Sequence, residues 1–139
     1  MLEPTLAFQT AVRATLIAAP GVLALVPADH IRAGSTRPER MPCIIIADGR
    51  VTYAGRASGS QLVARVGLAL HVWAIEDGAD TAKAIGHAVS AVLTDAPATE
   101  GFDLDEFAMP SLVWMRDPQP EHSYTHGVLN LEAVLRWRV

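Results

Sequence analysis

The chain has 139 residues, a length typical of one domain, so we expect a single domain over residues 1–139. Half of the residues are hydrophobic and 19% are charged, which indicates a globular protein with its own core and excludes a disordered chain. Eleven Lys and Arg against fifteen Asp and Glu give a net charge of −4, which argues against general affinity for nucleic acid.

Two further features bear on the setting of the protein. The lone Cys43 cannot form an internal disulfide, so nothing implies an oxidising compartment. Every apolar run is far shorter than the roughly 18 residues that cross a bilayer, and the N-terminus lacks a basic region followed by a long apolar stretch. We therefore expect a soluble protein that is neither exported nor bound to a membrane.

The first predicted element is a helix over residues 4–18. Its apolar residues recur at helical spacing, Pro4 suits the first turn of a helix, and the Pro-Gly pair at 20–21 ends it. We expect a brief second helical turn over residues 22–26, before a connector over residues 31–42 that is rich in Gly, Ser, Pro and Arg.

The middle of the chain is predicted to form strands. An apolar β-branched run over residues 43–46 predicts a short buried strand. The stretch 47–61 is rich in Gly and Ser, so we expect a long loop there, or a loosely paired hairpin around residues 51–53. Residues 61–75 give the clearest strand pattern, because every second residue from Leu62 to Ala74 is apolar. The other face of this strand is mixed and carries Val63, Arg65, Gly67, Ala69, His71, Trp73 and Ile75.

The C-terminal half is predicted to add a helix, a connector and two strands. The helix is expected over residues 78–94, followed by an acidic surface connector over residues 100–106. A short strand over residues 112–116 and a final strand over residues 127–139 complete the chain, with a loop over residues 116–126 between them. The final strand alternates between residues expected in the core (Leu129, Leu131, Ala133, Leu135, Trp137 and Val139) and residues expected to point away from it (Asn130, Glu132, Arg136 and Arg138).

This order of elements favours an α+β domain. Hairpin-length gaps indicate a mainly antiparallel β-sheet, and the apolar stripes of the two helices predict that both pack on one face of it. Two long loops are expected, over residues 47–61 and 116–126. Loops of that length in a compact domain are usually functional or mobile.

The histidines provide weak candidates for metal binding and for acid–base chemistry. His122 and His126 stand four residues apart, as a zinc pair on a helix would, but they fall in an expected loop beside two prolines and lack an obvious third ligand. We therefore expect no metal site. His71 shares the mixed strand face with Arg65, but no Asp or Glu lies two residues along that face to orient it. A buried or interfacial histidine is the expected reading.

Other catalytic arrangements are equally poorly supported. Asp103, Asp105 and Glu106 cluster without flanking aromatic residues that would bind a sugar ring, so a solvated face is expected. Cys43 opens an apolar strand and is expected to be an inert core thiol. The serines and glycines of the 47–61 stretch match neither a nucleophile elbow nor a phosphate-binding loop. We expect neither an enzyme nor a bound cofactor.

The remaining signal is a surface for contact with other proteins. Small residues beside Arg65 and Trp73 on the mixed strand face suit a subunit interface, although Trp73 packed under a loop and outward charges that are merely solvated remain alternatives. Arginines concentrate between residues 32 and 56, which hints at an anionic partner surface or DNA, or at a solvated Arg-rich loop. The candidate interface residues are Arg50, Tyr53, Arg56, Arg65, His71, Trp73, Glu132, Arg136 and Arg138.

Four stretches, taken in order, carry a resemblance to a known family. They are AVRATLIAAPGVLALVPADHIRAG, RPERMPCIIIADG, ARVGLALHVWAIEDGADTAKAIGHAVSAVL and WMRDPQPEHSYTHGVLNLEAVLRWRV, and they span nearly the whole chain. In pattern and order the chain resembles the small tail-completion proteins of tailed phages and gene transfer agents, often called tail terminators. No catalytic signature contributes to this resemblance.

The resemblance implies an α+β domain that assembles into a hexameric ring. Such a ring caps the finished tail tube, stops its polymerisation and joins the tail to the DNA-filled head. The implied partners are further copies of the chain, the major tail-tube protein and a head–tail connector or stopper protein, with DNA passing through the lumen without specific binding. The implied location is the head–tail junction of a virion or gene-transfer-agent particle assembled in the host cytoplasm.

Two alternatives remain open from the sequence. The chain could be another ring protein of the head–tail connector, such as a stopper or adaptor. It could also be a small enzyme or ligand-binding domain that uses His71 or the 122–126 loop, which predicts a concave pocket around them.

Overall fold

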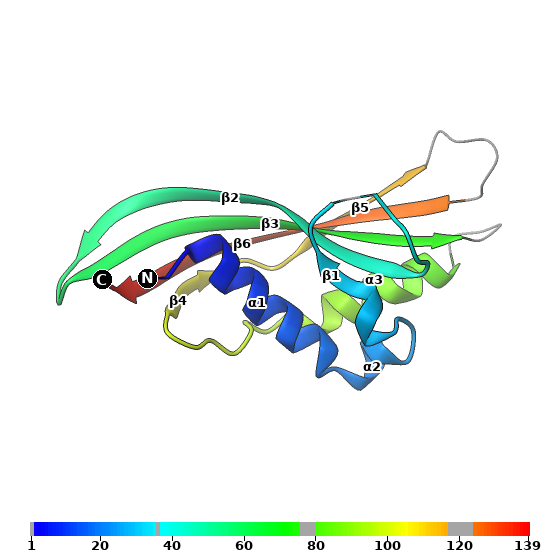
Figure 1. Ribbon diagram of the computed structural model, residues 1–139, viewed down its shortest axis with the longest axis horizontal. Coiled ribbons are helices and arrows are strands. Elements are labelled where there is room, and N and C mark those ends of the chain that lie inside the picture. The colour runs from blue at the N-terminus through cyan, green and yellow to red at the C-terminus, as the bar shows by residue number, and fades with distance from the viewer. Residues whose placement is uncertain (1, 36, 76–79, 117–123) are drawn as a thin grey trace.

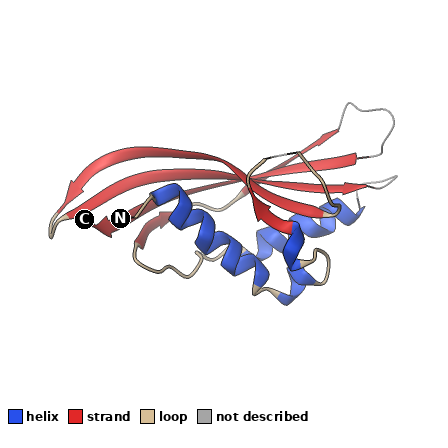
Figure 2. Cartoon of the chain, in the orientation of Figure 1, coloured by secondary structure: helices blue, strands red, loops and turns tan. Residues whose placement is uncertain are grey.

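The computed structural model describes residues 2–35, 37–75, 80–116 and 124–139. A long, curved sheet forms one layer and the helices form a second layer beneath it (Figures 1 and 2). The helices are α1 (Pro4–Ile17), α2 (Pro20–Leu23), a 3-10 turn η1 (Ala28–His30) and α3 (Asp80–Val92). The strands are β1 (Ile31–Ala33), β2 (Cys43–Ala57), β3 (Gln61–Ile75), β4 (Asp103–Phe107), β5 (Ser111–Arg116) and β6 (Tyr124–Arg138).

The six strands form one sheet in the order β1-β2-β3-β6-β4, with β5 also paired to β6. β1 runs parallel to β2, and every other pair is antiparallel. β4 pairs with the C-terminal half of β6 and β5 with its N-terminal half, so the two short strands lie one after the other along the same edge. The predicted α+β class with a mainly antiparallel sheet is confirmed.

Both long helices pack on the same face of the sheet, as predicted. α1 begins after Glu3, whose carboxylate accepts hydrogen bonds from the amides of Thr5 and Leu6 at 3.2 and 2.7 Å. Its buried stripe joins that of α3 and the alternate residues of the long strands in one apolar core. The largest fully buried side chains of this core are Phe8, Leu16, Ile31, Ile44, Ile46, Leu70, Ile85, Leu93, Leu129, Leu131 and Leu135. Among the described helices, none is long and apolar enough to span a membrane.

The prediction of a long loop over residues 47–61 is wrong. β2 continues to Ala57 and pairs with β3 throughout, so the alternative of a hairpin is confirmed and its turn contains only residues 58–60. The glycines that suggested a loop lie at irregular points of the hairpin. Gly55 has a φ of 131° beside a register shift, and Gly59 has a φ of 76° in the turn.

Two further expectations are wrong, and a third lies partly outside the described residues. Residues 103–107 form the edge strand β4 instead of a surface connector, because Leu104 and Phe107 pack against the core. Val139 is 66% exposed and does not belong to the core. Of the expected loop over residues 116–126, both ends belong to β5 and β6, and residues 117–123 lie outside the described ranges.

One aromatic side chain joins α3 to the sheet. The Trp114 indole lies so close to Gly86 of α3 and Gly127 of β6 that a Cβ would stand 2.8 Å from it at the first glycine and 2.5 Å at the second. Neither position has room for a methyl group unless the indole moves. Trp114 therefore packs as a wedge between the helix layer and the sheet layer.

Gly86→Ala and Gly127→Ala are each expected to lower the free energy of unfolding by about 2 kcal/mol, because the added methyl group collides with the indole. Urea denaturation of the two variants measures this. Gly21→Ala is the control, since a Cβ there meets nothing within 4 Å. Wild-type stability in both Gly86→Ala and Gly127→Ala would contradict the wedge.

Candidate interaction surface

The face of the sheet opposite the helices, called here the outer face, is the surface on which the predicted interface can be examined. Residues paired across neighbouring antiparallel strands share a face, so the register assigns the members of the outer face. On β3 they are Val63, Arg65, Gly67, Ala69, His71, Trp73 and Ile75.

The structure brings most of the predicted interface residues onto this face. Arg65, His71 and Trp73 come from β3, Glu132, Arg136 and Arg138 come from β6, and Arg50 of β2 pairs with Gly67. Tyr53 and Arg56 are different, because they pair with Ala64 and Leu62, which face the core. Tyr53 makes an edge-to-face contact with Trp137 at 6.4 Å between ring centroids. These two residues therefore lie on the helix side of the sheet.

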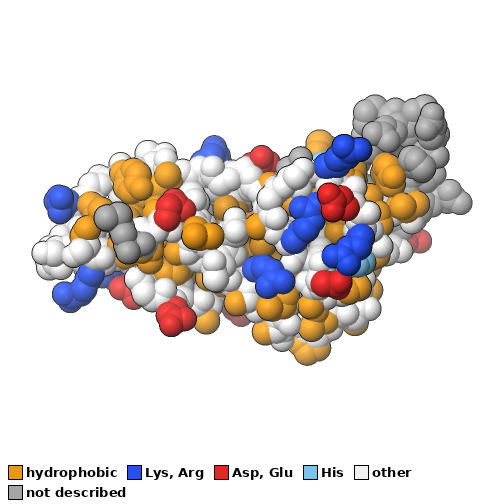
Figure 3. All heavy atoms as spheres, in the orientation of Figure 1, with side chains coloured by type: hydrophobic (Ala, Val, Ile, Leu, Met, Phe, Trp, Pro, Cys, Tyr) orange, Lys and Arg blue, Asp and Glu red, His pale blue; other side chains and the backbone are white. Residues whose placement is uncertain are grey.

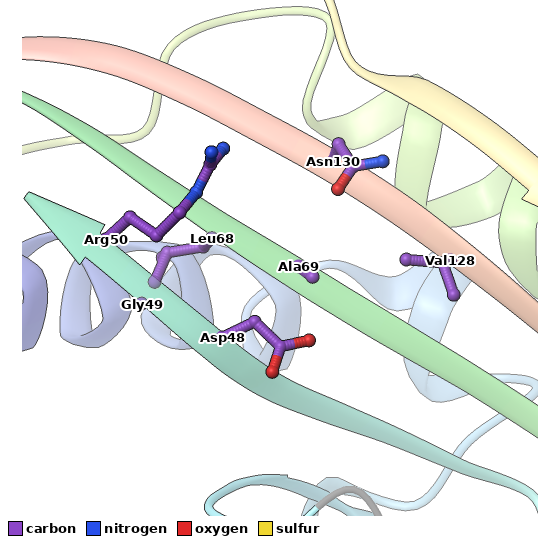
Figure 4. Close-up of a pocket in the computed structure, with 7 residues that line it drawn as sticks. All are labelled: Asp48, Gly49, Arg50, Leu68, Ala69, Val128 and Asn130. Carbon is purple, nitrogen blue, oxygen red and sulfur yellow. The ribbon is translucent and has the colours of Figure 1, made fainter.

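A shallow hollow of about 480 Å³ lies in the middle of the outer face. Asp48 and Arg50 from β2 border one side, Val128 and Asn130 from β6 border the other, and Ala69 of β3 lies between them (Figure 4). The Arg50 guanidinium lies over Gly67, whose Cβ would stand 3.0 Å from Nη2. The hollow exists because β3 has only small residues, Gly67 and Ala69, on the outer face at this point.

Charged residues gather at the end of the outer face near β4. Arg136 bridges Asp103 at 3.3 Å and Asp105 at 3.2 Å, and Arg65 bridges Glu106 at 3.6 Å. The Asp103 and Glu106 side chains are 64% and 68% exposed, so their bridges contribute little to stability, whereas Asp105 is 37% exposed. Asp103, Asp105 and Glu106 therefore form the expected solvent-facing acidic group. Arg65 of β3 and Arg136 of β6 form ion pairs with it.

A histidine pair occupies the outer face beyond the hollow. His71 is only 8% exposed, and its Nδ1 lies 2.8 Å from Nε2 of His126. The other ring nitrogen, Nε2, lies 3.0 Å from Oδ2 of Asp48. His71 is buried, in line with the expectation of a buried or interfacial histidine. No Asp or Glu lies two residues along its own strand face, but a carboxylate from another strand contacts it. Asp48 reaches it from the neighbouring strand, at a bulge where its own φ is 55°.

The far end of the outer face is apolar. The Trp73 indole stacks on the His126 ring at 3.8 Å between centroids and is 9% exposed. It forms a small second core with Cys43 and Ile45, against which Met41, Ala47 and Tyr124 pack. Beyond this core, Ile75, Val113 and Met115 are 57%, 56% and 43% exposed. The outer face therefore presents a patch of large apolar side chains to solvent.

The thiol of Cys43 fits the predicted inert role. Burial raises the pKa of Cys43 to about 11, against a smaller lowering effect of the nearby Arg32 charge. The thiol is therefore protonated at neutral pH and is a poor nucleophile. No group of three or more metal-binding side chains occurs in the part of the chain that the structure describes. His122 lies outside that part of the chain, so the structure does not test whether His122 and His126 could bind a metal together.

The arginines between residues 32 and 40 serve the connector that joins β1 to β2. Arg32 donates to the carbonyls of Ser35 and Arg37 at 3.1 and 2.8 Å, and Arg40 bridges Asp29 at 3.1 Å. Figure 3 shows Lys and Arg side chains gathered over β1 and this connector, with Asp and Glu side chains among them. The local balance of charges does not favour an anionic partner there.

Comparisons with known proteins identify the family of the chain and solved structures that share its fold. The family model described as tail completion protein gp17 matches residues 10–136. A chain of the virion of a native gene transfer agent particle aligns with a TM-score of 0.72 and 21% identity, covering 94% of this chain and 95% of that one. The gp17 protein of bacteriophage SPP1 aligns with a TM-score of 0.57 and 17% identity, covering 94% and 89%.

No curated protein sequence matches the chain. The two solved structures establish a shared fold, and the family model extends over nearly the whole of the sequence. The predicted resemblance is confirmed, and the chain belongs to the gp17 family of tail completion proteins.

Proposed function

We propose that copies of this chain assemble into a hexameric ring that caps the finished tail tube, ends its polymerisation and joins the tail to the head. The observation that carries the proposal is the outer face, where a long sheet has helices on one side only and presents Ile75, Val113 and Met115 to solvent on the other. Large exposed apolar side chains grouped on one face are typical of a surface that another protein covers.

The proposed partners are the major tail-tube protein on one side of the ring and a head–tail connector or stopper protein on the other. The ring is placed at the head–tail junction of a virion or gene-transfer-agent particle. DNA passes through its lumen without specific binding, and the net charge of −4 is compatible with this because affinity for phosphates requires an excess of Lys and Arg at the contact. A stopper or adaptor ring is the alternative, and the identity of the bound partner separates the two.

The candidate interface residues have different places in this proposal. Arg50, Arg65, Glu132, Arg136 and Arg138 are assigned direct contacts with a neighbouring copy or partner from the outer face. Tyr53 and Arg56 are assigned contacts made by the end of the β2–β3 hairpin. His71 and Trp73 are assigned a supporting role, because they are 8% and 9% exposed.

We assign the chain no catalytic role and no cofactor. The contact between Asp48, His71 and His126 is the arrangement that comes closest to acid–base chemistry. The Cys43 thiol on the same strand face is a poor nucleophile, since with a pKa of about 11 it stays protonated at neutral pH.

Native mass spectrometry of the chain, alone and mixed with its tail-tube protein, tests the proposed ring. A species of six copies is expected in at least one of the two samples. Val113→Glu is expected to reduce binding of the tube protein or of a neighbouring copy by at least about tenfold, since it places a charge in the apolar patch. Leu6→Glu is the control, because Leu6 is 57% exposed on the helix side and Val113 is 56% exposed on the outer face. A chain that is monomeric in both samples would contradict the proposal.

Trp73→Ala tests the supporting role assigned to that residue. The variant is expected to lose about 3 kcal/mol of folding stability, because the indole fills a small core against Cys43 and Ile45. Thermal unfolding followed by circular dichroism measures the loss. An unchanged melting temperature with weakened subunit association would instead make Trp73 a contact residue.

A further inference from the structure

The sheet has two open edges in the described part of the chain. β1 pairs only with residues 44–46 of β2, so residues 47–57 of β2 have no strand on that side. On the other side of the sheet, β4 and β5 each pair only with β6, so both have an open side there. Unpaired strand edges are templates for pairing with another chain. We call these surfaces the β2 edge (residues 47–57) and the β4 edge (residues 103–107).

The β2 edge and the β4 edge lie toward the same end of the sheet. The register places Gly55, Val63, Arg136 and Asp103 in one row that crosses the sheet from the β2 edge to the β4 edge. If a second copy were placed beside the first in the same orientation, its β4 would lie next to β2. Within one copy, β2 and β6 run in one direction and β3 and β4 run in the opposite direction. The β4 strand of the second copy would therefore run antiparallel to β2 of the first.

The two edges differ in charge. Residues 95–107 contain five carboxylates and no Lys or Arg, and within this stretch the outer-face acids are Asp103, Asp105 and Glu106. The two arginines that bridge these acids, Arg65 and Arg136, neutralise only part of that charge. The β2 edge has a net charge of +1: Asp48 contacts His71, whereas Arg50 on the outer face and Arg56 on the helix side form no ion pair with a described residue. Opposite charges therefore stand at opposite edges of one sheet.

We infer that the β4 edge of one copy docks against the β2 edge of the next, head to tail, with Glu106 and its acidic neighbours facing Arg50. The inference rests on the proposed ring and names the surfaces that build it. A contact between two different edges is heterologous, so a pair of copies still has one free edge of each kind. Further copies can add in the same way until the contacts close into a ring. An isologous dimer would instead bring arginines against arginines.

The irregular backbone of β2 limits how the edges join. Register shifts interrupt its pairing between Ala47 and Arg50 and between Tyr53 and Gly55. Bulges of this kind discourage a continuous hydrogen-bonded ladder with a foreign strand. Charge attraction therefore supplies much of the selectivity, and the contact is expected to weaken as salt rises.

Charge reversal of each edge tests the inference. Arg50→Glu sets a second carboxylate against Glu106 of the neighbour, and Glu106→Arg sets a second guanidinium against Arg50, so each variant alone is expected to associate at least about tenfold more weakly than the wild type. An equimolar mixture is expected to recover assembly with the two variants alternating, since positions 50 and 106 then carry opposite charges across every contact. Native mass spectrometry at low salt, with and without the tail-tube protein, distinguishes the variants by mass and detects even-numbered, alternating rings.

Arg37→Glu and Glu39→Arg are the matched controls, because both residues are exposed on the connector and belong to neither residues 47–57 nor residues 103–107. They are expected to assemble as the wild type does. Wild-type rings that neither edge reversal weakens, or a mixture that stays unassembled, would overturn the edge contact and leave the ring proposal standing. A wild type that never assembles would overturn both.

Discussion

The pairing of β3 with β6 is the constraint on which the rest of the structure depends. Each strand has fifteen residues, and the two pair along their whole length without a register shift. Because side chains alternate along a strand, this unbroken register fixes which residues enter the core and which form the outer face. β2 attaches to one side of the pair and β4 and β5 to the other, while α1 and α3 cover the core face.

A sheet that is covered on one face only gives the protein two unlike surfaces. The covered face supplies the apolar burial that stabilises the domain, and the outer face is free to vary in chemistry along its length. In this chain it changes from an apolar end around Val113 and Met115, through the hollow over Ala69, to a charged end around Arg136. In the proposed ring, these regions of different character would each suit contact with a different neighbour.

The sequence predicted those elements whose pattern is set by burial on one side. Alternation over residues 61–75 and 127–139 identified the two central strands, and helical spacing identified α1 and α3. Edge strands were harder, because β4 buries only Leu104 and Phe107 partially and the glycines of β2 look like loop residues. Asp48 was missed beside His71 because the register of a bulged hairpin cannot be counted from the sequence.

The wedge formed by Trp114 between α3 and β6 has a consequence for how this protein can change over evolutionary time. Gly86 and Gly127 are distant in sequence, yet both must stay without a side chain while the indole occupies the space between them. A smaller residue at position 114 would release both glycines at once and leave a void to be filled. Residues 86, 114 and 127 are therefore expected to covary among relatives: glycines at 86 and 127 where position 114 is Trp, and larger residues there where position 114 is small.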